Sequence, residues 1–169
     1  APYAFDDTGK LRAGPNPNFK QVANGLPGLE LRLPLLFDAM VSKGRMGLEK
    51  FVELTATAPA RIYNLSPRKG AIAIGADADV VLWNPDREVT LADAMVHDRT
   101  RYTPYAGRRI TGWPEPVLLL GASLSEDGKL NADAGSGRFL ARNGGDAAKP
   151  LGRLRPEMDP ERNFGARLL

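Results

Sequence analysis

Residues 24–37 read NGLPGLELRLPLLF, and this stretch decides how the chain is organised. Its first half carries two turn signals, Asn24-Gly25 and Pro27-Gly28, because these residues adopt the backbone angles that tight turns need. From its second half onward, apolar residues recur every three or four positions, which predicts one buried helix face. These residues are Leu29, Leu33, Leu36, Phe37 and Met40. Pro34 fits such a helix only near its first turn, where a missing N–H is tolerated.

The residues before this stretch form a long connection and not a regular element. Gly14-Pro15-Asn16-Pro17-Asn18 holds two prolines, which fix φ and remove hydrogen-bond donors, so it belongs inside neither a helix nor a strand. A loop of this length in a compact protein is usually functional or disordered, and rarely a mere connection. Its apolar side chains indicate that it packs against another part of the protein; they are Phe5, Phe19, Val22 and Leu26.

The helical pattern continues to about residue 65. Gly44, directly after Lys43, predicts the end of the first helix. A second apolar stripe follows and predicts a second helix; it consists of Leu48, Phe51, Val52 and Thr55. Pro59 is expected to break this helix, and residues 60–63 are expected to form a short further helical turn.

From residue 70 the pattern changes to the alternation of strands. Ile72 and Ile74 alternate, and Val80–Trp83 is predicted to be a buried strand that ends at an Asn84-Pro85 turn. Further strands are predicted at residues 108–111 and 117–120, and a hairpin at residues 122–130 around Asp127-Gly128. Helices followed by strands predict a junction of two architectures and not one alternating domain. Beyond residue 140 the pattern fades into an extended tail that is expected to become ordered only against a partner.

The composition excludes several classes of protein. The 169 residues include no Cys and one His, so the chain forms no disulfides, no thiolate zinc site and no multi-histidine metal centre by itself. No apolar run approaches the roughly 20 residues that span a bilayer, and no export signal opens the sequence. The surplus that gives the net charge of +3 lies in residues 98–169, where the basic residues are scattered and form no dense stripe, which argues against nucleic-acid binding.

Few residues are candidates for chemistry. His97-Asp98 is interpreted as a surface or capping pair, because a catalytic base needs a nucleophile or a metal beside it. Asp77 and Asp79 are expected to fix a tight turn, and Asp6-Asp7 to be solvated. Asn24-Gly25 stays open between a plain turn and a place where the main chain approaches a ligand closely.

Four segments together resemble the dihydropyrimidinase and D-hydantoinase family of cyclic amidohydrolases. The first is the NGLPGLELRLPLLF run already quoted, and the second is TATAPARIYNL at residues 55–65. The third is the GxxxxGADADV pattern from Gly70 to Val80, and the fourth runs from MVHD at residues 95–98 to YTPYAG at residues 102–107. The similarity covers roughly residues 1–140, in the right order and spacing.

The resemblance implies an α/β fold. It places this chain at the C-terminal part of an amidohydrolase TIM (β/α)8 barrel, followed by the C-terminal strands of a β-sandwich. Residues 1–66 would be the end of the metal-dependent barrel, with the substrate loop and final helices. Residues 67–140 would supply β-sandwich strands, and residues 141–169 an extended, intersubunit C-terminal tail.

The resemblance also implies an activity, the hydrolytic ring opening of dihydropyrimidines or 5-substituted hydantoins by two zinc ions. The family's Asp-His-x-Pro signature appears here only as Ala1-Pro2, so the zinc ligands and the catalytic acid would lie upstream. This chain would then hold no catalytic and no metal-binding residue, and would be inactive alone. One family role transfers: Asn24, with Gly25 beside it, would bind the substrate ring through main-chain groups.

Two alternatives remain open. One is a non-enzymatic dihydropyrimidinase-like structural or signalling protein, and the other is a related hydrolase such as an allantoinase or dihydroorotase. The NGxPGxExR pattern favours the hydantoinase branch. The expected partners are a small cyclic amide, the N-terminal remainder of the enzyme and further copies in a homotetramer, with no nucleic acid or membrane. The expected location is the cytoplasm.

Overall fold

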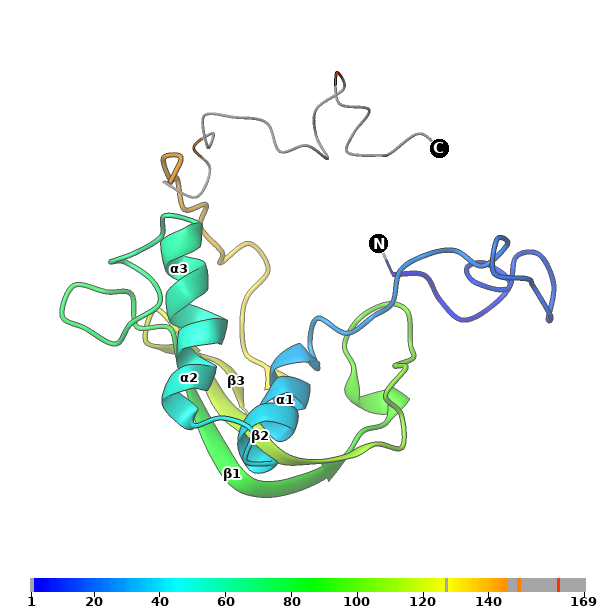
Figure 1. Cartoon of the computed structure of the whole chain (residues 1–169), viewed down its shortest axis with the longest axis horizontal. Helices are drawn as coiled ribbons and strands as arrows, with labels where there is room; N and C mark the ends of the chain where they lie inside the picture. Colours follow the sequence, from blue (N-terminus) through cyan, green and yellow to red (C-terminus); the bar gives the residue numbers. More distant parts are fainter. Residues whose placement is uncertain (1, 127, 146–148, 150–160, 162–169) are drawn as a thin grey trace.

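A computed structural model describes residues 2–126, 128–145, 149 and 161. Two helical segments lie against one side of an antiparallel sheet, and two long loops pack together beside the first helix (Figure 1). These loops are residues 2–31, blue in the figure, and residues 91–108, which connect two strands of the sheet. No helix in the described part of the chain is both long and apolar enough to cross a membrane.

The first helical segment consists of α1 (Arg32–Phe37) and the π-helical turn η1 (Asp38–Ser42). Pro34 lies in the first turn of α1, as predicted, and Gly44 ends the segment with a φ of +66°. The predicted helical position of Leu29 is wrong: the residue lies before the helix, and its side chain is 81% exposed. Residues 29–31 form a turn that leads into the helix, which begins at Arg32.

The second helical segment joins α2 (Leu48–Val52), the π-helical turn η2 (Glu53–Thr57) and α3 (Ala58–Ile62) without interruption. The predicted break at Pro59 is therefore wrong. The Ala58 N–H donates to the carbonyl of Glu53, five residues earlier, and this wider turn accommodates the proline at the start of α3. Of the predicted apolar stripe, Phe51 is buried, whereas Leu48 and Val52 are exposed.

The sheet consists of β1 (Val80–Thr90), β2 (Arg109–Leu119), β3 (Ala122–Glu126) and β4 (Lys129–Leu130). Its order is β1-β2-β3-β4, and all neighbouring strands are antiparallel. The predicted hairpin is confirmed, with Ser125 opposite Leu130. A short 3₁₀ helix, η3 (Asp93–Met95), lies in the connection between β1 and β2.

Three strand predictions are corrected by the structure. β1 continues through Asn84-Pro85, because a register shift between Asn84 and Glu88 takes up the proline that cannot donate to the ladder. The two predicted strands at residues 108–111 and 117–120 are one strand, β2. Ile72 and Ile74 lie in a loop with fully exposed side chains, so their alternation is not that of a strand.

The sheet and the helices meet at a cluster of three aromatic rings. Phe37 stacks on Trp83 of β1 with ring centroids 4.5 Å apart. Phe51 meets both rings edge-on, at 5.3 Å from Phe37 and 5.9 Å from Trp83. A second buried cluster, of Leu31, Leu91 and Ile110, joins the two long loops to β2.

Phe37 is seated directly on Gly112 of β2. A Cβ atom at Gly112 would lie 2.2 Å from the Phe37 ring, and the φ of this glycine is +93°. Next to Phe37, the buried Asp38 carboxylate accepts the Thr111 N–H at 3.1 Å and the Lys43 ammonium at 2.8 Å. Burial acts to raise the pKa of Asp38, but these two donors outweigh it and hold the pKa below its ordinary value.

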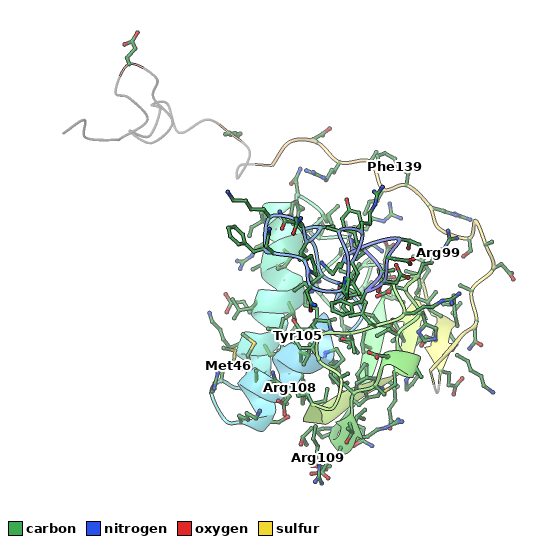
Figure 2. All side chains as sticks on the ribbon, turned by 90° about the vertical axis from the view of Figure 1, so that its right-hand side faces the viewer. Met46, Arg99, Tyr105, Arg108, Arg109 and Phe139 are labelled. Atoms are coloured by element: carbon green, nitrogen blue, oxygen red, sulfur yellow. The ribbon has the colours of Figure 1, made fainter. Side chains whose placement is uncertain are left out.

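The end of the described chain runs past α3. The Arg142 guanidinium lies 5.7 Å from the centre of the Tyr63 ring, and the Asn64 side chain donates to the Asn143 carbonyl at 3.2 Å. Phe139 lies on the segment that leads there and is 95% exposed (Figure 2). Of the predicted intersubunit tail at residues 141–169, only residues 141–145, 149 and 161 are described, and the contact with a neighbouring subunit stays a prediction.

Replacing Gly112 by Ala is expected to lower the free energy of unfolding by about 3 kcal/mol, because the new methyl group displaces the Phe37 ring and strains a positive φ. Gly137→Ala is the matched control, since no atom lies within 4 Å of its new Cβ. Urea unfolding monitored by Trp fluorescence measures both variants. Equal stability of the two variants would contradict the role of Gly112.

Candidate functional site

The two segments that carry the most specific sequence motifs are in contact. The Phe5 ring lies 5.5 Å from the Tyr102 ring, measured between centroids. A Cβ atom at Gly28 would lie 3.6 Å from the Tyr105 ring, so the main chain of this glycine rests on the tyrosine. Figure 2 shows Tyr105 between the N-terminal loop and the first helix. The NGxPGxE run and the YTPY run, which lie some 70 residues apart in sequence, therefore form one surface.

The first part of the N-terminal loop is a compact turn. The Asp6 carboxylate accepts the backbone N–H of Thr8 at 2.9 Å and its hydroxyl at 2.7 Å. The Thr8 hydroxyl is the main reason that the pKa of Asp6 is lowered. Gly9 has no room for a side chain, because a Cβ atom would lie 2.2 Å from the Ala4 carbonyl oxygen. Asp6 thus belongs to a turn.

A buried lysine joins the two ends of this loop. Lys10 is 5% exposed, and its ammonium donates to the carbonyl oxygen of Ala23 at 2.6 Å. Among the described residues, no carboxylate forms an ion pair with Lys10. The sequence analysis missed this residue, because a single lysine in a polar loop is typical of solvent exposure.

Asn24 and Gly25 follow directly and lie on the surface. Gly25 has a φ of +114°, a conformation that glycine adopts without strain. Between described residues, no hydrogen bond uses the main chain of Asn24 or Gly25. Within the part of the chain that the structure describes, these peptide groups therefore have no hydrogen-bond partner, although the residues that flank them are held in place.

The other end of the loop is held by Glu30. Its carboxylate accepts the His97 backbone N–H at 2.8 Å and pairs with His97 Nδ1 at 2.7 Å. The hydrogen bond to Glu30 and its charge raise the pKa of His97. The sequence contained both residues within its motifs, but nothing in it indicated that they meet.

The interpretation of His97-Asp98 as a non-catalytic pair agrees with these contacts. The His97 ring is exposed and bonded to Glu30, and the Asp98 carboxylate caps the Thr100 N–H at 2.8 Å. In the same loop the buried Tyr102 hydroxyl has no hydrogen-bond partner among the described residues, and burial raises its pKa. None of these groups forms the nucleophile and base pair that hydrolysis without a metal would need.

The carboxylates of Asp77 and Asp79 stabilise a loop through ion pairs and belong to no metal site among the described residues. Asp77 pairs with Arg68 and with Lys69, each at 2.9 Å, and Lys69 also pairs with Asp79. Asp79 in addition accepts the Leu120 N–H at 3.0 Å, which ties the loop to the turn between β2 and β3. The predicted turn role of the two aspartates is supported, whereas the role of Lys69 was missed.

The family resemblance implies a zinc site formed by residues upstream of this chain, and the described residues form no metal site of their own. Nowhere in residues 2–126 and 128–145 do three or more His, Cys, Asp or Glu side chains gather in an arrangement that holds a metal ion. His97 Nδ1 is already paired with Glu30. No step of a reaction is therefore assigned to a metal held by these residues.

Two cavities open on either side of Leu33, Val81 and Trp83. One, of about 420 Å³, lies next to the Glu30–His97 pair and extends to the tip of the β3–β4 hairpin. The other, of about 470 Å³, lies between the second helical segment and the loop of Lys69. Their walls are mainly apolar and carry no convergent catalytic groups, so we assign neither as the reaction site.

Comparisons with known proteins agree with this picture. An amidohydrolase family model matches residues 40–111. D-hydantoinase of Ralstonia pickettii is 39% identical over 125 residues, which are 74% of this chain and 27% of the relative. D-phenylhydantoinase of Escherichia coli O1:K1 is 42% identical over the same shares of the two chains. The resemblance of this chain to the hydantoinase and dihydropyrimidinase family is thereby confirmed.

Solved hydantoinase structures contain the same arrangement of elements. One D-hydantoinase structure matches 84% of this chain and 30% of its own, with a TM-score of 0.77 and 37% identity. Dihydropyrimidinase from Brevibacillus agri matches 88% of this chain and 31% of its own, with a TM-score of 0.78 and 34% identity. The fold is thus that of part of a hydantoinase, and the chain spans under a third of the length of these relatives.

The Glu30–His97 pair predicts a pH dependence of stability. Because the pKa of His97 is raised above its ordinary 6.5, the pair stabilises the fold fully below that pH and loses this contribution as pH rises through the raised value. NMR titration of the single imidazole is expected to show the raised pKa, and Glu30→Gln to return it towards 6.5. An unchanged titration in Glu30→Gln would contradict the pairing.

The Lys69 network predicts a larger effect on stability than an exposed ion pair. Lys69→Met is expected to lower the free energy of unfolding by about 1–2 kcal/mol, because it leaves the half-buried Asp77 with fewer partners. Lys50→Met is the control, since its pair with Glu53 lies on the helix surface, where solvent screens an ion pair and little stability is lost with it. Thermal unfolding of the two variants compares them, and equal losses would argue against the network.

Proposed function

We propose that this chain is the C-terminal part of a cyclic amidohydrolase that opens the rings of dihydropyrimidines or 5-substituted hydantoins by hydrolysis. The names of its relatives support the class of reaction. The observation that carries the role of this chain is the main chain of Asn24 and Gly25, which forms no hydrogen bond with any described residue and lies next to residues that are firmly held.

Asn24 and Gly25 bind the substrate ring in this proposal. A cyclic amide presents N–H and C=O groups side by side, and exposed peptide N–H and C=O groups are their natural partners. The loop is anchored before Asn24 by Ala23 and after Gly25 by the buried Pro27 and by Glu30. A main chain that is already ordered loses little conformational entropy when it binds a ligand.

Residues 1–66 form the end of the barrel in this proposal, and residues 67–140 contribute to the β-sandwich. The order of helices followed by an antiparallel sheet supports this division. Residues 141–169 contact a neighbouring subunit of a homotetramer. The location in the cytoplasm rests on the sequence alone and stays a prediction.

The chemistry of bond cleavage lies outside the described residues. In this proposal the two zinc ions, their ligands and the catalytic acid belong to the N-terminal remainder of the enzyme, upstream of this chain. Two bound metal ions would supply an activated water and polarise a carbonyl group. This chain contributes ring binding and the packing that holds the substrate loop, and is expected to be inactive by itself.

Substitutions in the complete enzyme test this role. Asn24→Ala is expected to keep kcat/KM within about threefold, because the main chain does the binding. Gly25→Val forces a φ of +114° on a branched residue and moves the peptide groups, so kcat/KM for hydantoin is expected to fall about tenfold or more. Initial rates of hydantoin ring opening, followed by ultraviolet absorbance, measure both variants.

Gly14→Val is the control for this pair of variants. Gly14 lies in the same loop with a φ of +107° and has no atom within 4 Å of a new Cβ, so it carries the same strain at a distance from Asn24. Its kinetics are expected to match those of the unaltered enzyme. A tenfold loss of kcat/KM in Gly14→Val, or no loss in Gly25→Val, would contradict the assignment of Asn24 and Gly25 to the substrate site.

A further inference from the structure

The ammonium of Lys10 is the most buried charged group in contact with the substrate loop. The residue is 5% exposed, and its Nζ lies 2.6 Å from the Ala23 carbonyl oxygen. That carbonyl belongs to the peptide group whose N–H is carried by Asn24. Lys10 therefore contacts the same peptide group that the proposed function uses for substrate binding.

The backbone of Lys10 is itself rigidly placed. Its N–H donates to the Ala4 carbonyl at 2.9 Å, and the Leu11 N–H donates to the Asp6 carbonyl at 2.8 Å. Gly9 is packed so tightly on Ala4 that no side chain fits there. The ammonium is thus held by a fixed turn, and the Ala23 carbonyl is held by the ammonium.

Fixing one side of a peptide group also fixes the other. The peptide is planar, and in the usual trans form its C=O and N–H point in opposite directions. A cation on the Ala23 oxygen therefore orients the Asn24 N–H towards the opposite side, where no described residue accepts it. The cation also draws electron density onto the oxygen, which makes the N–H a stronger donor.

We propose that Lys10 is a positioning residue, which orients and polarises the Ala23–Asn24 peptide so that the Asn24 N–H donates to a ring carbonyl of the cyclic amide. This inference rests on the proposed function. Lys10 does not contact the substrate; it acts through the peptide group. The Glu30–His97 pair holds the far end of the same loop, which leaves Lys10 as the group that sets the direction of this one donor.

Lys10→Met in the complete enzyme tests the proposal, because methionine keeps the apolar length of the side chain and removes the ammonium. With hydantoin as substrate, KM is expected to rise about tenfold or more, whereas kcat stays within about threefold, since the lost interaction is made equally in the bound and transition states. Lys20→Met is the matched control: Lys20 lies in the same loop, and its Nζ is 6.0 Å from the Phe19 ring centre. Its kinetics are expected to be unchanged.

A second variant separates positioning from general damage to the fold. Asn24→Pro removes the N–H that Lys10 is proposed to orient, so Lys10→Met in that background is expected to raise KM no further. The proposal would be overturned if Lys10→Met and Asn24→Pro raised KM additively. A parallel loss of kcat and thermal stability in Lys10→Met would overturn it too. If Lys10→Met is not recovered folded, Lys10→Gln is judged by the same criteria.

The outcomes distinguish this inference from the proposed function. If the unaltered enzyme opens the ring and Lys10→Met has the same KM, the inference is overturned and the proposed function stands. Failure of the unaltered enzyme to open hydantoin or dihydrouracil would overturn the proposed function, and the inference with it. A raised KM with near-normal kcat, absent in Lys20→Met and in the Asn24→Pro background, supports both.

Discussion

The contact of Phe37 with Gly112 is the constraint on which the arrangement of helix and sheet depends. The ring occupies the space that any other residue would fill with a side chain, and it also stacks on Trp83. The neighbouring Asp38 then bonds to the N–H of Thr111, next to that glycine. One apolar contact and one buried carboxylate thus fix both the distance and the register between the first helical segment and β2.

The candidate site follows from the same arrangement at the other end of the first helix. Leu31 is packed against Leu91 and Ile110, so the residues that lead into the helix are anchored on the loop that precedes β2. Glu30 then meets His97, and Gly28 rests on Tyr105. The motifs of the sequence are therefore contact partners, and Asn24 and Gly25, which lie between Lys10 and Glu30 in the sequence, are the residues proposed to bind substrate.

Local signals in the sequence predicted the local elements. The Glu126–Lys129 hairpin, the helix end at Gly44 and the place of Pro34 depend on backbone preferences of a few neighbouring residues. The predictions at Pro59 and Asn84-Pro85 failed because a π-helical turn accommodates the first proline and a register shift in β1 accommodates the second. The residues themselves indicated Asn24-Gly25 as a turn or a ligand contact, and only the family resemblance implied substrate binding there. The contacts of Lys10 and Lys69 depend on distant residues and left no local signal.

The bulge in β1 also decides how this sheet can grow. β1 is the long outer strand of the described sheet, whereas the opposite outer strand, β4, spans only Lys129–Leu130. Pro85 has no N–H, and the strand is bent between Asn84 and Glu88, so the rim of β1 is interrupted. A flat strand from an unrelated chain cannot pair along its whole length. The irregularity that accommodates Pro85 therefore allows only a strand with a matching bend to pair along the whole edge of β1.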